Sequence, residues 1–336
     1  MQKANNTMHL IKQRSAKKAV AKCMLPLLCF AACCGFSAAR AADTLRVAQD
    51  GSADFTSIQK AIEATKAYPV EPVVILIKKG VYKEKVRVPA WNTDLSLIGE
   101  DKENTIITYD DYFKKIDKDR NSTFYTATLS IEAERVSVKN LTIINAAGPV
   151  GQALAISISA DQCVIDNCNM DGHQDTFFAT GSHTHVYVKN SRVAGTTDFL
   201  FGDATVLLDH CDIYCKTGSY IVAASTNKGQ AFGFVLNHCK VSAASDVKHG
   251  LLGRTWRPYA KTVFLNSELG AFLAGAGWDN WRSKANETSS FYAEYGNTGA
   301  GANRENRAAW SHELTEGELR TYTPENILGA WVGQYL

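Results

Sequence analysis

The sequence lacks the short motifs that mark several common catalytic sites. It has no G-x-S-x-G, so a nucleophile elbow of the α/β-hydrolase type is not visible. It has neither H-E-x-x-H nor a P-loop, which argues against a zinc peptidase and a P-loop nucleotide site. No C-x-x-C pair occurs either, so a structural zinc site is not expected.

Low-complexity linkers are also absent. Hydrophobic residues make up 45% of the 336 residues and charged residues 21%, so the chain can bury a large core and wholesale disorder is not indicated. Without an internal boundary, we expect a single folded domain over residues 42–336.

Acidic residues are missing from the first 41 positions. A basic start is followed by the apolar run 23–34 and by Ala39-Arg40-Ala41, an A-x-A cleavage pattern. This order predicts a secretory signal peptide over residues 1–41 and a secreted protein, extracellular or periplasmic. The apolar run is too short to span a bilayer. Because Phe30–Cys33 loosely resembles a lipoprotein cleavage site, a lipid anchor on Cys33 is the alternative.

Removal of this segment would change the charge of the protein. Residues 1–41 carry seven basic residues, so the remainder has 29 basic and 34 acidic residues, a net charge near −5. A mildly acidic protein is a poor candidate for nonspecific nucleic-acid binding. It should also weakly repel polyanions.

Five cysteines remain after residue 41. They are Cys163, Cys168, Cys211, Cys215 and Cys239. The odd number predicts at least one free thiol or an intermolecular bond. The pairing is left open by the sequence.

A β-rich unit recurs from about residue 45 to residue 269. Each copy has an apolar run, an Asn or His marker, and a second apolar run. The markers are separated by 27, 23, 20, 28 and 28 residues and comprise Asn140, Asn167, Asn190, His210, His238 and Asn266. This irregular repeat predicts an all-β fold, a right-handed parallel β-helix whose turns stack at about 4.8 Å. A β-sandwich is the alternative, but it would need closer hairpin turns.

Short helices are predicted at both ends of this solenoid. Thr56-Ser-Ile-Gln59 is a capping-box pattern that predicts a capping helix near the N-terminal end. Near the C-terminus, Thr315-Glu-Gly-Glu318 and Thr323-Pro324 begin two more short helices.

Two aspartates occupy the same phase of neighbouring repeats. Asp175 lies eight residues after Asn167, and Asp198 lies eight residues after Asn190. Stacked turns would bring the two carboxyl groups to within roughly 5 Å of each other. Like charges at that distance resist joint ionisation, so one carboxyl group should keep its proton. The pair suits acyl transfer by an Asp nucleophile and an Asp acid; two solvated turn aspartates are the alternative.

Five further residues could complete such a site. Gln152 and Gln174 carry amide donors that can stabilise an oxyanion. Arg254 could hold one carboxylate ionised through a bidentate contact. Trp256 and Phe201 offer flat apolar faces for sugar rings, although Phe201 could equally be a core residue.

Several segments resemble, in order, the signature motifs of pectin methylesterases. They are Asp50–Gln59, Gly80–Glu84, Gly151–Ala155, Gly172–Thr176, Gly195–Gly202, Leu252–Trp256 and Gly296–Gly299. The resemblance implies hydrolysis of C6 methyl esters of homogalacturonan, without a metal or organic cofactor. It implies methylated pectin as the partner, and we expect a monomer.

The resemblance also implies roles for single residues. Asp198 corresponds to the nucleophile and Asp175 to the general acid, later the base. Gln152 and Gln174 correspond to the oxyanion stabilisers, and Arg254 to the residue that anchors the nucleophile. Trp256 corresponds to a substrate-stacking residue.

The chain departs from the family pattern at two positions beside the site. Thr197 replaces a commoner Val next to the nucleophile, and Thr255 replaces a frequent Pro. Because Thr255 frees the backbone, it could shift the neighbouring Trp256.

The histidines and one glutamate outside this set receive structural interpretations. His173 is expected to be structural, and His210 and His238 are expected to stack at their repeat position. His183 and His185 make at best a weak metal site, and Glu84 is expected to be a structural partner.

Two other functions fit parts of the pattern. One is a non-catalytic polysaccharide-binding protein on the same fold, and the other is an esterase for a different acyl substrate. If the chain acts on pectin, its net negative charge predicts a preference for highly methylated material and release after few steps.

Overall fold

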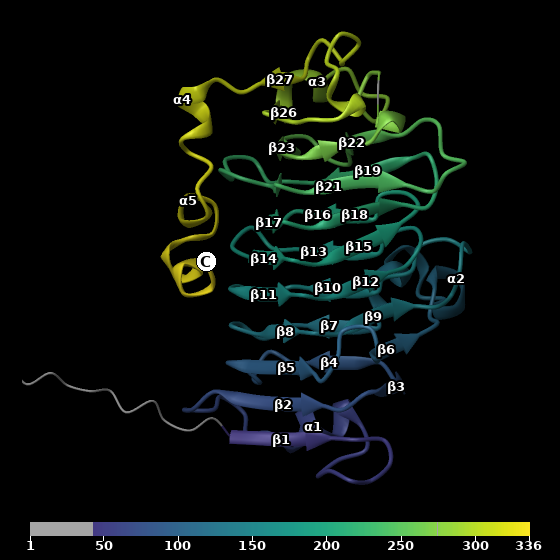
Figure 1. Ribbon diagram of the computed structural model, residues 1–336, viewed down its shortest axis with the longest axis vertical. Helices are drawn as coiled ribbons and strands as arrows, with labels where there is room; N and C mark the ends of the chain where they lie inside the picture. Colours follow the sequence, from purple (N-terminus) through teal and green to yellow (C-terminus); the bar gives the residue numbers. More distant parts are fainter. Residues whose placement is uncertain (1–42, 274) are drawn as a thin grey trace, which may run out of the picture. The chain divides into compact units, whose positions relative to one another are not determined.

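The computed structural model describes residues 43–273 and 275–336. The predicted signal peptide and the alternative lipid anchor on Cys33 lie outside these residues. Within them, three sheets run along a stack of coils, and their strands pair in parallel throughout (Figure 1). The prediction of a parallel β-helix is confirmed, and the sandwich with its antiparallel hairpins is excluded.

The chain visits the three sheets in turn. The first sheet contains β1 (Asp43–Val47), β2 (Val73–Ile77), β5 (Leu95–Gly99), β8 (Ser137–Lys139), β11 (Cys163–Asp166), β14 (His185–Lys189), β17 (Thr205–Asp209), β20 (Phe234–Asn237), β23 (Lys261–Leu265), β26 (Phe291–Tyr295) and β27 (His312–Glu313).

The other two sheets contain eight strands each among the described residues. The second sheet contains β3 (Gly80–Lys83), β6 (Thr105–Tyr109), β9 (Thr142–Asn145), β12 (Asn169–Asp171), β15 (Arg192–Gly195), β18 (Asp212–Cys215), β21 (Lys240–Ala243) and β24 (Glu268–Leu269). The third sheet contains β4 (Val86–Val88), β7 (Leu129–Ile131), β10 (Ile156–Ile158), β13 (Phe177–Ala179), β16 (Leu200–Gly202), β19 (Tyr220–Ala224), β22 (Leu251–Thr255) and β25 (Trp278–Asp279).

The helices are short. The α-helices are α1 (Ile58–Ala64), α2 (Phe113–Ile116), α3 (Asn286–Ser289), α4 (Glu316–Leu319) and α5 (Pro324–Leu328). The 3-10 helices are η1 (Asp119–Tyr125), η2 (Ala271–Leu273), η3 (Ala300–Ala302) and η4 (Ala330–Tyr335). In the described part of the chain, none has the length and apolar character needed to cross a bilayer.

The repeat markers form the corner between the first and second sheets. All six have positive φ angles between 48° and 55°, a left-handed conformation in which Asn is enriched. The Asn167 amide donates to Oδ1 of Asn140 at 2.8 Å, which links two turns. His210 and His238 stack at 4.9 Å between ring centroids, so their predicted stacking is confirmed.

The residue after each marker points into the core. This column is at most 3% exposed and consists of Leu141, Cys168, Ser191, Cys211, Cys239 and Ser267. The five described cysteines are free and buried, including Cys211 and Cys239 on consecutive turns. Burial raises the pKa of the Cys163 thiol to about 12.

Helix α1 packs against β1, β2 and β4 at the N-terminal end of the coil, as expected for a capping helix. Its N-cap is Ser57 rather than Thr56. Glu84, reaching from the end of β3, accepts hydrogen bonds from Ser57 Oγ and from the amides of Ile58 and Gln59. Glu84 is therefore a structural partner, as predicted.

The C-terminal helices begin where the sequence predicted. Thr315 and Glu318 form a reciprocal capping box at α4, and Thr323 caps α5 ahead of Pro324. Helix α5 packs on the outer face of β14 and β17, along the side of the stack and not over its end (Figure 1). Its buried residues Ile327 and Leu328 cover an apolar outer face of the first sheet.

Candidate active site

The two aspartates lie on adjacent turns between the second and third sheets. Phe177 pairs with Leu200 in the register of β13 and β16, which places Asp175 and Asp198 at equivalent positions. The amide of Asp175 donates to the Thr197 carbonyl at 3.2 Å, inside the next turn. The match in phase predicted from the repeat is thus present in the structure.

Both aspartates hold a backbone conformation that few residues adopt. The φ angle is +66° at Asp175 and +49° at Asp198. Asp is among the residues best suited to this region because its short polar side chain tolerates it. The residues are 8% and 6% exposed, so they are not the solvated turn aspartates of the alternative interpretation.

Arg254 contacts only one of the two carboxyl groups. From β22, its Nε donates to Asp198 Oδ1 at 2.9 Å and its Nη2 to Asp198 Oδ2 at 2.5 Å. This bidentate pair fixes the carboxylate plane and favours the ionised form of Asp198.

The electrostatic environments of the aspartates differ. Burial, followed by the charge of Asp198, raises the pKa of Asp175 well above its ordinary value. Burial also raises the pKa of Asp198, but the hydrogen bonds and charge of Arg254 oppose that shift. Asp198 therefore loses its proton before Asp175 does.

The Arg254 guanidinium is also held by two aromatic rings. Its Cζ lies 4.1 Å from the ring centroid of Tyr220 and 3.7 Å from that of Trp281. The Tyr220 carbonyl in turn accepts the amide of Asp198 at 2.8 Å. One residue on β19 thus contacts both members of the ion pair.

All seven predicted site residues line one cavity of about 540 Å³. They are Gln152, Gln174, Asp175, Asp198, Phe201, Arg254 and Trp256. Gln152 and Gln174 form a parallel bridge between adjacent turns, so their side chains enter the site from neighbouring levels. The structure therefore brings the whole candidate set into one cavity.

An aromatic row runs along the third sheet. Phe178 stacks on Phe201 at 4.7 Å between centroids, and Phe124 and Trp256 flank this pair at 5.0 and 5.7 Å. Phe201 is only 4% exposed, so most of its ring is packed and a small part reaches the cavity. Phe201 is therefore mainly a packed residue, and its contact with a sugar ring stays a prediction.

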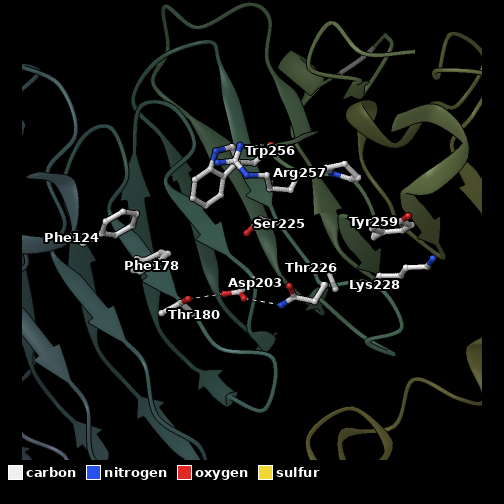
Figure 2. A pocket seen from close by; sticks show the side chains of 12 residues that line it. Phe124, Phe178, Thr180, Asp203, Ser225, Thr226, Lys228, Trp256, Arg257 and Tyr259 are labelled. Atoms are coloured by element: carbon white, nitrogen blue, oxygen red, sulfur yellow. Dashed lines mark hydrogen bonds between the residues drawn. The ribbon is translucent and has the colours of Figure 1, made fainter. Parts of the chain in front are cut away.

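A second hollow of about 560 Å³ adjoins the first and shares Phe124, Trp256 and Arg257 with it. In its wall, Thr180 Oγ1 and Asn227 Nδ2 donate to the Asp203 carboxylate at 2.7 and 2.8 Å. Figure 2 shows Thr180 beside Asp203. Together the two hollows form a groove that is longer than the cavity at the aspartates.

Several groove residues were not predicted. Phe124 and Arg120 lie on η1, in an excursion outside the repeat, and Trp281 follows β25 near the end of the coil. Tyr220, which contacts Arg254 but lines neither hollow, was also not predicted and carries no motif of its own. The available signal was indirect, because Tyr220 lies 22 residues after Asp198, close to one repeat.

The two departures from the family pattern have defined contacts. The buried Thr255 hydroxyl accepts a hydrogen bond from Asn286 Nδ2 at 2.7 Å, and the Trp256 amide donates to the Ala224 carbonyl at 3.0 Å. Thr197 Oγ1 accepts from Ser219 Oγ at 2.6 Å. Thr255 and Trp256 are thus both tied to neighbouring segments.

His173 participates through its backbone. Its carbonyl accepts the Thr196 amide at 3.0 Å and the Thr176 hydroxyl at 3.2 Å. Burial lowers the pKa of its imidazole. These contacts agree with the structural role expected for it.

Comparison with known proteins gives a consistent result. Residues 44–330 match the family model described as Pectinesterase. The chain is 33% identical over 282 residues to Pectinesterase 31 of Arabidopsis thaliana, covering 82% of this chain and 88% of that protein. It is 34% identical to a pectinesterase of Petunia integrifolia over 79% of this chain and 73% of the relative.

Some relatives are longer than this chain. It spans 53% of a probable pectinesterase/pectinesterase inhibitor of Arabidopsis thaliana, at 34% identity.

Solved structures resemble the fold closely. A pectin methylesterase from carrot superposes with a TM-score of 0.81 at 29% identity, covering 87% of this chain and 95% of the carrot protein. A pectin methylesterase from Erwinia chrysanthemi gives 0.75 at 26% identity, covering 87% and 98%. A pectin methylesterase in complex with a hexasaccharide gives the same values.

The fold and these comparisons define a carboxylic ester hydrolase built on a parallel β-helix. The chain is therefore an enzyme of this class and not the non-catalytic polysaccharide-binding protein of the alternative hypothesis. With the family model matched over most of its length, the chain belongs to the pectinesterase family.

Proposed function

We propose that this chain hydrolyses the C6 methyl esters of homogalacturonan, with Asp198 as the nucleophile. The observation that carries this assignment is the bidentate contact of Arg254 with Asp198, while Asp175 lacks such a cation and has a pKa raised well above the ordinary value. An ionised carboxylate can attack, and a protonated one can donate.

In the first half-reaction, a carboxylate oxygen of Asp198 attacks the ester carbonyl carbon. The side-chain amides of Gln152 and Gln174 stabilise the resulting oxyanion. The carbon–oxygen bond to the methoxy group breaks, and Asp175 gives its proton to the departing methanol. The product is an acyl-enzyme anhydride on Asp198.

In the second half-reaction, the ionised Asp175 takes a proton from water as that water attacks the anhydride carbonyl. The bond to Asp198 breaks and releases a galacturonate carboxylic acid, which ionises. Asp198 is again a carboxylate beside Arg254, and Asp175 is again protonated. Atoms and charge therefore balance over the cycle.

The groove supplies an aromatic surface for the polymer beside the aspartates. Trp256 and the exposed edges of Phe124 and Phe201 give apolar faces that suit sugar rings. A related pectin methylesterase forms a complex with a hexasaccharide, which supports an extended binding groove here.

The test is methanol release from methylated pectin. We expect Asp198→Ala to abolish it while the circular dichroism spectrum is unchanged. Asp212→Ala is the matched control, because Asp212 is an exposed aspartate on the next turn of the second sheet. Retention of methanol release by Asp198→Ala would contradict the assignment.

A substrate panel addresses the alternative acyl substrate. Wild-type protein is assayed on methylated pectin, acetylated pectin and a simple thioester. We expect methanol release from the first to exceed turnover of the others; faster turnover of an acetyl or thioester substrate would favour the alternative.

We also propose that the protein is secreted after cleavage behind Ala41 and acts as a monomer. Mass spectrometry of the exported protein would give its first residue, and light scattering its mass in solution. A start at a lipidated Cys33 would support the anchored alternative.

A further inference from the structure

Two consecutive turns break the asparagine ladder at the corner between the first and second sheets. Four of the six marker positions are Asn, whose amides can link neighbouring turns. The other two are His210 and His238, in the same left-handed conformation. This substitution places two imidazoles one above the other on the outside of the coil.

A carboxylate lies against both imidazoles. Nδ1 of His210 is 3.1 Å from Oδ2 of Asp209, and Nδ1 of His238 is 3.6 Å from Oδ1. One potential ligand atom from each of the three residues can be chosen so that all lie within 4.8 Å of one another.

The carboxylate of Asp209 is held by hydrogen bonds, whereas the two imidazoles are largely exposed. Asn237 Nδ2 donates to its Oδ1 at 3.0 Å, and the Tyr187 hydroxyl donates to its Oδ2 at 3.3 Å. Its side chain is 16% exposed, against 61% and 48% for His210 and His238. Donors that orient a carboxylate in this way typically surround metal ligands.

Lys189 is the cation that faces Asp209 across the strand register. Its ammonium group donates to the carbonyl of Tyr335, at the C-terminal end of η4. A metal ion bound by Asp209 would therefore lie near a lysine whose ammonium group is already hydrogen-bonded to the Tyr335 carbonyl.

We propose that Asp209, His210 and His238 form a binding site for Zn²⁺ or a similar late first-row divalent metal. In a tetrahedral zinc site, bonds of about 2.0–2.2 Å to N and O place neighbouring ligand atoms about 3.3 Å apart. The distances of 3.1 Å to Oδ2 and 3.6 Å to Oδ1 of Asp209 are close to that value, although each nitrogen approaches a different carboxylate oxygen. Closing the site then requires rotation of the exposed imidazoles.

The chemistry of the ligands selects the metal. Imidazole nitrogens with one carboxylate favour zinc, copper or nickel, whereas magnesium and calcium prefer all-oxygen sites. Exposure of both rings leaves a coordination position open to water.

This site is separate from the ester hydrolysis machinery. It lies at the corner between the first and second sheets, whereas Asp175 and Asp198 lie between the second and third. A metal here would join two consecutive turns and stabilise the folded coil, because it binds ligands that unfolding separates.

The test is calorimetric titration of the full chain with zinc chloride at neutral pH. Wild type is compared with His210→Asn, His238→Asn and the double variant. Asn occupies the four other ladder positions, so these variants should keep the fold. We expect each single variant to weaken zinc binding by about tenfold or more, since even residues that only orient a ligand contribute about 10- to 100-fold.

The double variant also measures zinc bound elsewhere, for example by cysteines near the start of the sequence. His249→Asn is the matched control, because His249 is exposed and outside the cluster. A rise in unfolding temperature with zinc should occur in wild type and in the control, but not in the double variant. Equal zinc binding by wild type and the double variant, or none by either, would overturn the proposal.

Discussion

At the scale of single residues, the site depends on different environments around two aspartates that occupy equivalent positions on adjacent turns. Both are buried, and burial alone would raise both pKa values. Arg254 removes the symmetry because it donates hydrogen bonds to Asp198 alone, whereas it acts on the pKa of Asp175 only through its charge. A cation assigned to one side chain thus determines which carboxyl group ionises first.

Asp175→Asn should change how stability depends on pH. The pKa of Asp175 is raised in the folded protein. As the pH rises past about 3.8, Asp175 therefore loses its proton in the unfolded chain before it does so in the folded one. Wild type should therefore lose stability relative to the variant, at up to about 1.4 kcal/mol per pH unit, until the folded Asp175 ionises. Thermal unfolding at a series of pH values measures this.

Exposed Asp212 provides the control for that comparison. The curve of Asp212→Asn should run parallel to that of wild type. If Asp175→Asn also ran parallel, the burial-induced shift at Asp175 would be refuted.

Tyr220 should act on the reaction through Arg254, without lining the cavity that holds the aspartates. A cation–π contact contributes about 0.5–2 kcal/mol, so Tyr220→Leu should lower kcat by about 2- to 30-fold with little change in KM. In this variant, the acidic limb of the pH profile of kcat should move to higher pH. A less firmly positioned Arg254 would stabilise the Asp198 carboxylate less, so the pKa of Asp198 would rise.

Tyr220→Phe is the control that preserves the ring. It should retain most of the wild-type kcat and the wild-type pH profile. Equal losses in the Phe and Leu variants would show that the ring face is not what positions Arg254.

The sequence predicted the residues of the site that lie within the repeat. Asp175 and Asp198 share a phase, and Gln152 comes about one turn before Gln174, so counting residues placed these side chains near one another. Their separate roles were predicted only from the family resemblance. Trp281 and Phe124 were not predicted because they lie outside the repeated unit, where the residue spacing does not indicate a position in the coil. Tyr220 has the right spacing, but its contact with Arg254 depends on side-chain direction.

At the scale of elements, helix α1 shows how a partner distant in sequence can decide a boundary. The local pattern Thr56–Gln59 predicted a capping box, yet Ser57 is the N-cap and Glu84 receives the free amides. Glu84 directly follows β3, which the chain reaches only after passing through β2. Local patterns predicted that a helix exists here, but tertiary contact set its first residue.

Glu84→Ala should destabilise the protein without reducing the activity of the native form. Hydrogen bonds to a charged acceptor contribute about 1.5–3 kcal/mol net, and water can replace part of this interaction at the half-buried Glu84, so we expect a loss of about 2 kcal/mol in the free energy of unfolding. Urea unfolding measures the loss. Glu63→Ala is the control, since Glu63 on the same helix forms an exposed pair with Lys60 and should change stability by under about 0.5 kcal/mol.

At the scale of the whole molecule, net charge and local charge act in opposite directions. After the predicted cleavage, the net charge near −5 should repel a polyanionic chain and favour highly methylated pectin. Yet Arg120 and Arg257 line the cavity that holds the aspartates, and Lys228 lines the adjoining hollow. Since charges are screened beyond about 8 Å at physiological ionic strength, the groove cations should dominate there.

Lys228→Gln separates these effects. Lys228 lies beside Tyr259 in the wall of the second hollow (Figure 2), where we expect it to bind a free carboxylate of a de-esterified unit. We expect the variant to raise KM about threefold for pectin of low methylation, a loss typical of an exposed charge pair, with little effect on highly methylated pectin. Lys248→Gln, an exposed lysine outside the groove, is the control. Because salt screens the attraction, the difference in KM change between the two pectins should shrink as ionic strength rises. Equal KM changes on both pectins would mean that Lys228 contacts the polymer but does not bind its free carboxylates.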